Sequence, residues 1–93
     1  MPWALAIAQL IDANVAAVRG DRSAATAFTI AEQALVAADM HLYAAICRYR
    51  RGQLTAGDDG TTLASSARAE LLALGARNPE RIADMVVPGH YRR

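Results

Sequence analysis

Alanine dominates this chain: 22 of its 93 residues are Ala, and no segment alternates apolar and polar residues as a half-buried strand does. Alanine has the highest intrinsic helix propensity, and its methyl side chain lets helix axes approach closely. The sequence therefore predicts an all-α fold of thin, tightly packed helices. A chain of this length has room for one small core, so we expect a single domain over residues 1–93.

Apolar periodicity, cap residues and turn residues predict five helices, at about residues 3–18, 23–38, 40–54, 62–74 and 79–86. Residues 57–60, Gly-Asp-Asp-Gly, are typical of a turn and are expected to separate the third helix from the fourth. The first helix has an apolar stripe that consists of Leu5, Ala8, Ile11, Val15 and Val18. The fourth helix has an inner face that consists of Leu63, Ala67, Leu71 and Leu74.

A short helix at the C-terminal end has the strongest start signal in the chain. Asn78 is a favoured N-cap residue, and Pro79 fits the first helical position without losing a needed hydrogen bond. Ile82, Met85 and Val86 step by three and four along one face. We expect that face to lie across the end of the fourth helix, so that the last helix caps the domain.

The four long helices have similar lengths and short connections, a pattern that predicts two stacked antiparallel helical hairpins. Ala24, Phe28 and Ala31 have the small-large-small spacing typical of the second helix of a tetratricopeptide (TPR) repeat, and residues 67–74 repeat it imperfectly. The expected architecture is therefore TPR-like, with the short last helix added as a cap.

Four segments resemble one recurrent protein tail: residues 41–45, 48–52, 57–60 and 75–89. The most specific part runs from Arg77 to Gly89, with Asn-Pro-Glu-Arg near its start and Pro-Gly at its end. These segments resemble the extreme C-terminus of large bacterial signalling proteins, chiefly eukaryotic-like serine/threonine protein kinases. In those proteins a kinase domain is followed by a long TPR-like array.

The resemblance implies that the chain is the C-terminal part of a longer protein and caps its helical array. It implies a non-catalytic module that binds a protein or peptide, with the preceding repeats of the same chain as a further partner. If such repeats have been removed, the first helix should expose apolar side chains, with Leu5, Ile11 and Val18 as the residues to examine. The alternative is a free-standing small helical protein, such as a homodimeric regulator.

Enzymatic activity is not expected of this chain. The sequence contains no glycine-rich phosphate loop, no His-Arg-Asp and no Asp-Phe-Gly, the motifs with which a kinase holds ATP and its metal ions. Cys47 is the single cysteine, and no Cys or His lies at metal-ligand spacing from it, so we expect a buried core residue. No metal and no cofactor is expected.

The residues proposed for contact with a partner lie in the third helix. Arg48 and Arg51 share a helix face while Arg50 points away, and with Tyr49 they are weak candidates for contact with a phosphate or an acidic peptide. The alternative, which we favour, is that these arginines are exposed to solvent at the end of the helix, where the helix dipole favours cations by about 0.3–1 kcal/mol each.

Charge and hydropathy exclude two further classes of partner. A net charge of +1 is too small for a nucleic-acid-binding surface, so no nucleic acid is expected. The longest uncharged run, residues 1–11, is shorter than the roughly 20 residues of a membrane span. We therefore expect a cytoplasmic protein with no membrane span.

Overall fold

The computed structural model describes residues 2–89, and within them it contains five α-helices and no strand. The helices are α1 (Pro2–Val18), α2 (Ala24–Ala37), α3 (His41–Leu54), α4 (Gly57–Ala73) and α5 (Pro79–Val86). The all-α class is confirmed, and α5 has the bounds expected from the sequence. Met1 and residues 90–93 of the expected domain lie outside the described residues.

Helix α4 begins earlier than expected. Residues 57–60 were predicted to form a turn, but they are the first turn of α4, with Asp58 and Asp59 at its N-terminal end. Carboxylates are stabilised there by the helix dipole, which explains why two acidic residues between glycines do not break the helix. Leu74, expected on the inner face, follows the last helical residue and is 47% exposed.

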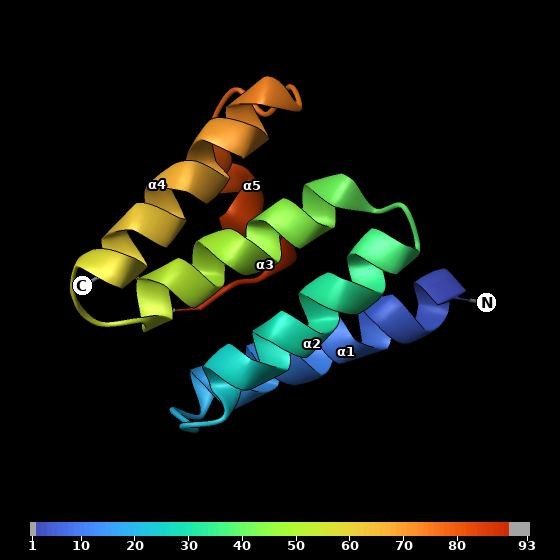
Figure 1. Ribbon diagram of the computed structural model, residues 1–93. Coiled ribbons are helices and arrows are strands. Elements are labelled where there is room, and N and C mark those ends of the chain that lie inside the picture. Colours follow the sequence, from blue (N-terminus) through green and yellow to red (C-terminus); the bar gives the residue numbers. More distant parts are fainter. Residues whose placement is uncertain (1, 90–93) are drawn as a thin grey trace.

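Helix α3 is the centre of the structure. Consecutive helices pack on one another, α1 on α2, α2 on α3 and α3 on α4, while α5 contacts α3 and α4 (Figure 1). More residues are buried on α3 than on any other helix: Ala44, Ala45, Ile46, Cys47, Tyr49, Arg50 and Gly52. The stacking of two TPR-like hairpins remains a prediction. In residues 2–89 no helix is both long enough and apolar enough to cross a membrane.

The end of α3 and the start of α4 touch through their backbones. A Cβ atom on Gly52 would lie 2.5 Å from the backbone nitrogen of Ala64, and one on Gly60 would lie 2.7 Å from the carbonyl oxygen of Gly52. Neither position has room for a side chain. The two glycines therefore set how closely α3 and α4 approach.

Helix α1 packs through a different face from the apolar stripe seen in the sequence. Its buried residues are Ala6, Leu10 and Ala13, whereas all five residues of the stripe are exposed. Alanines on the inner side let the α1 backbone come close to α2, so the larger side chains remain outside. The expectation for Leu5, Ile11 and Val18 is confirmed: they are 63%, 57% and 64% exposed.

Candidate interaction surfaces

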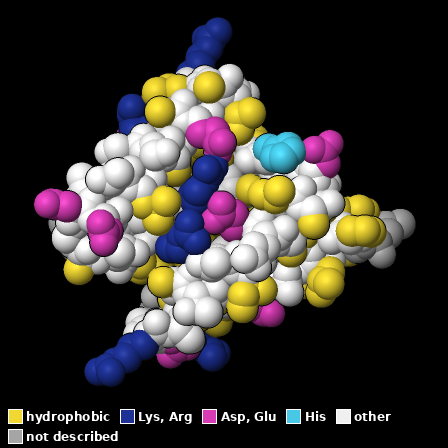
Figure 2. Space-filling model, in the orientation of Figure 1, with side chains coloured by type: hydrophobic (Ala, Val, Ile, Leu, Met, Phe, Trp, Pro, Cys, Tyr) yellow, Lys and Arg dark blue, Asp and Glu magenta, His cyan; other side chains and the backbone are white. Residues whose placement is uncertain are grey.

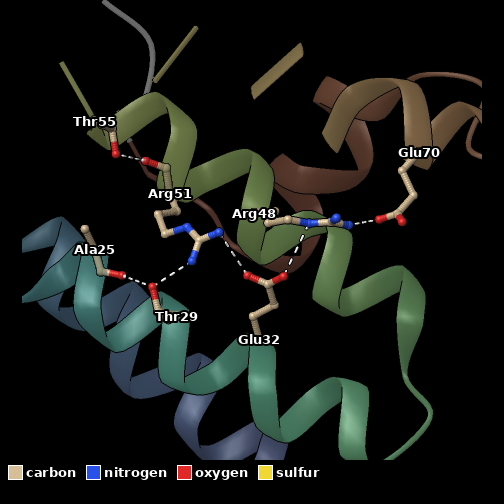
Figure 3. Close-up of polar contacts among 7 residues, drawn as sticks. All are labelled: Ala25, Thr29, Glu32, Arg48, Arg51, Thr55 and Glu70. Carbon is tan, nitrogen blue, oxygen red and sulfur yellow. Dashed lines mark hydrogen bonds and ion pairs between the residues drawn. The ribbon is translucent and has the colours of Figure 1, made fainter. Parts of the chain in front are cut away.

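The arginines of α3 point to two sides of the helix. Arg48 and Arg51 lie on the side of α2, and each forms an ion pair with Glu32 of that helix (Figure 3). Arg50 lies on the other side, where it pairs with Asp84 of α5. The shared face of Arg48 and Arg51 agrees with the sequence analysis. The alternative of a solvated helix end is wrong for Arg50, whose side chain is 1% exposed.

Glu32 bridges the two arginines on the α2 side. Its Oε2 atom lies 3.3 Å from Nε of Arg48, and its Oε1 atom lies 3.2 Å from Nη2 of Arg51. Arg48 also pairs with Glu70 of α4, and Arg51 donates a 2.7 Å hydrogen bond to the hydroxyl of Thr29. This network, Glu32, Arg48, Arg51 and Glu70, joins α2, α3 and α4 across one face of the molecule.

The network leaves little charge available for a partner. In Figure 2, Lys or Arg side chains lie next to Asp or Glu side chains at the centre of the face that is drawn. The side chains of Arg48 and Arg51 are only 25% and 22% exposed, and Tyr49 is 7% exposed. A phosphate or acidic peptide would have to displace Glu32 or Glu70. Contact of these residues with a partner remains a prediction.

Arg50 is the site residue that the sequence analysis missed. Its side chain is 1% exposed, and Nε donates a 3.1 Å hydrogen bond to the carbonyl oxygen of Val87. The two terminal nitrogens donate to Gln53 at 2.8 Å and to Asp84 at 2.9 Å. A sequence signal existed, since Arg50 follows the buried Ile46 by one helical turn and so falls on an apolar face.

The face of α5 that packs is in part the one expected, since Ile82 and Val86 pack against the core while Met85 does not. Pro79, Ala83 and Val87 are buried, whereas Met85 is 74% exposed. Ile82 and Val86 are half-buried. The buried residues Pro79, Ala83 and Val87 are four apart and so lie along one side of α5. The side chain of Met85 lies outside this row.

Asn78 caps α5 as the sequence predicts. Its Oδ1 atom accepts a 3.1 Å hydrogen bond from the backbone nitrogen of Arg81, and Pro79 occupies the first turn. Two acidic side chains of α5 reach neighbouring helices: Asp84 reaches Arg50, and Glu80 accepts a 2.7 Å hydrogen bond from Arg68 of α4. That hydrogen bond raises the pKa of the Arg68 guanidinium.

Cys47 is fully buried, as the sequence analysis expects. Burial, with a smaller contribution from the charge of Glu32, raises the pKa of its thiol to about 12. The thiol is therefore protonated at neutral pH, and its environment is that of a packing residue rather than of a nucleophile. Among residues 2–89 no three His, Cys, Asp or Glu side chains are placed together so that they could hold a metal ion.

Comparison with known proteins finds no matching family, no similar curated protein and no similar solved structure. The likeness to the C-terminal tails of bacterial kinases therefore remains a prediction from the sequence.

Proposed function

We propose that the chain is a non-catalytic, TPR-like interaction module that caps the C-terminal end of a helical array. In this proposal its first partner is the preceding helices of the same polypeptide, a bacterial serine/threonine kinase or a related signalling protein in the cytoplasm. Its second is a protein or peptide that binds the array. The observation that carries the proposal is the difference between the two ends of the helical stack.

The outer face of α1 is suited to contact another helix. Ala8, Ile11, Val15 and Val18 of the apolar stripe follow one another at steps of three, four and three, and Ala4 continues this spacing one turn earlier; all five are exposed. Such steps repeat about every 3.5 residues, which is the spacing with which one helix packs along another. An exposed apolar stripe of this kind is typical of a surface that another element covers.

The other end of the stack is partly covered by α5. Helix α5 contacts α3 and α4, where it buries Ala83 and places Glu80 and Asp84 against arginines. The terminal unit of a helical array needs this replacement of an apolar face by a polar one. The contrast between an uncovered α1 face and a side of α3 and α4 that α5 partly covers supports a terminal unit over a unit from the middle of an array.

A photo-crosslinking residue in place of Val15, introduced into the protein in its own cells, tests the proposal. Thr62 is the control position, because it is exposed on α4, outside the apolar stripe. A crosslink from position 15 to a helix encoded earlier in the same reading frame supports the array-capping role. A crosslink to a second copy supports the homodimeric alternative, and no crosslink above the control contradicts both.

A further inference from the structure

Helix α5 presents two carboxylates, one helical turn apart, to two different helices. Glu80 pairs with Arg68 of α4 at 2.7 Å, and Asp84 pairs with Arg50 of α3 at 2.9 Å. Side chains four residues apart on a helix lie about 6 Å from each other along its axis. The two arginines therefore form a pair of cationic positions that matches two carboxylates one helical turn apart. This surface on α3 and α4 is called the α5 site below.

The apolar contribution to this contact comes from buried residues and from Ile82 and Val86, which are partly buried against the core. Pro79 and Ala83, which directly precede the two acidic residues, are buried together with Val87, while Met85 is 74% exposed. A helix of this length is not stable in water on its own. The position of α5 therefore depends on ion pairs as well as on burial.

The α5 site would keep its charges if α5 were displaced. Arg50 is 1% exposed beneath α5, and desolvation of a guanidinium is costly, so its return to water offsets part of the loss of contacts. Arg68, already 46% exposed, stays at the surface. An opened site would then present two cations beside an apolar strip.

We propose that the α5 site is a docking site for an acidic amphipathic helix of another protein, and that α5 occupies it in cis as a displaceable mimic of that helix. The partner helix carries carboxylates at positions i and i+4, each preceded by a small apolar residue, as in Pro79-Glu80 and Ala83-Asp84. Charge complementarity selects an acidic helix over a neutral or basic one. This inference concerns the α3 and α4 side of the chain and is independent of the α1 face.

A labelled synthetic peptide with the sequence of residues 77–89 is the probe. It is titrated by fluorescence anisotropy into the full wild-type chain and into the variant Glu80→Gln/Asp84→Asn, whose own α5 has lost both ion pairs. We expect the peptide to bind the variant about tenfold more tightly than the wild type, because its cis competitor is weakened. An Arg81→Ala chain is the matched control, since Arg81 is exposed on the same helix, and it should bind like the wild type.

The charge of the peptide provides the second comparison. A peptide that itself carries Glu80→Gln and Asp84→Asn should bind the variant chain at least about tenfold more weakly than the unaltered peptide. Equal affinity of the two peptides, or equal affinity of wild type and variant for the unaltered peptide, overturns the proposal.

Hydrogen exchange of the wild-type chain gives a test that does not depend on the folding of any variant. With isotope-labelled chain and excess unlabelled peptide, the amides of residues 83–86 should exchange faster as the peptide displaces α5, while those of α3 should not change. Exchange that is the same with and without the peptide contradicts displacement.

Discussion

The Nε atom of Arg50 donates a 3.1 Å hydrogen bond to the backbone carbonyl oxygen of Val87, which joins the middle of α3 to the residue that follows α5. Both residues are buried, Arg50 at 1% and Val87 at 0% exposure. A buried carbonyl needs a donor, and a buried guanidinium needs acceptors, so each residue satisfies the other. This contact makes Arg50 part of the core rather than of a basic surface.

Substitution of Arg50 should be more costly than substitution of an exposed arginine. Arg50→Ala leaves a cavity in the core and removes the donor to Val87, and we expect a loss of about 2–4 kcal/mol in the free energy of unfolding. Arg77→Ala, at an exposed position, should change it by less than about 0.5 kcal/mol. Urea unfolding followed by circular dichroism measures both. Equal midpoints with equal slopes would mean that Arg50 is not buried.

The substitution Gly52→Ala tests how closely α3 and α4 approach each other. In an open helix Gly→Ala stabilises by up to about 1 kcal/mol, so the sign of the effect is diagnostic. A Cβ atom on Gly52 would lie 2.5 Å from the backbone nitrogen of Ala64, and we expect Gly52→Ala to destabilise by about 1–3 kcal/mol or more. Thermal unfolding is a sufficient measurement. A raised midpoint would show that the two helices are further apart.

The cap of α5 can be tested separately from its packing. Asn78→Ala removes the acceptor for the backbone nitrogen of Arg81 and should cost about 1 kcal/mol. Ser66→Ala, on the exposed side of α4, is the control and should change stability by less than about 0.5 kcal/mol. Urea midpoints that coincide for the two variants would be evidence that Asn78 does not cap the helix.

Local signals were sufficient to predict five helices, but not the first turn of α4 or the face through which α1 packs. The bounds and the cap of α5 follow from Asn78 and Pro79, which act on the residues beside them. In α1 the larger apolar residues Leu5, Ile11 and Val18 are exposed as expected, whereas the residues through which the helix packs were not singled out from the sequence. Alanine is apolar and small, so in a chain this rich in it the close contact goes to alanines such as Ala6 and Ala13.

The arrangement of the α3 arginines was also predictable only in part, because some of their contacts are distant in the sequence. The common face of Arg48 and Arg51 follows from helical spacing, which is local. The partners of Arg50 lie 34 and 37 residues further along the chain, at Asp84 and Val87, and no periodicity within α3 could indicate them. An arginine on the apolar face of a helix was the available hint, because a buried charge requires a partner.

The buried thiol of Cys47 predicts a dependence of stability on alkaline pH. Burial raises the pKa of Cys47 to about 12 from the ordinary value of 9.0, so between these values the unfolded chain loses the thiol proton while the folded chain retains it. The free energy of unfolding should therefore fall as pH rises through this window. Urea unfolding of wild type and Cys47→Ala at pH 8, 9.5 and 11 measures it. A difference between the two proteins that is the same at all three pH values contradicts the raised pKa.

Two neighbouring residues of α1 separate the face that packs from the face that is open. Leu10 is 4% exposed and belongs to the core, whereas Ile11 is 57% exposed on the outer stripe. Leu10→Ala should cost about 2–4 kcal/mol through lost burial and a cavity, and Ile11→Ala less than about 1 kcal/mol, because in the isolated chain its side chain remains largely in water. If α1 instead packed through its larger apolar stripe, the order of the two effects would be reversed. Urea midpoints at several protein concentrations decide between these outcomes, because a cost for Ile11→Ala that grows with concentration would show that a second copy covers the stripe.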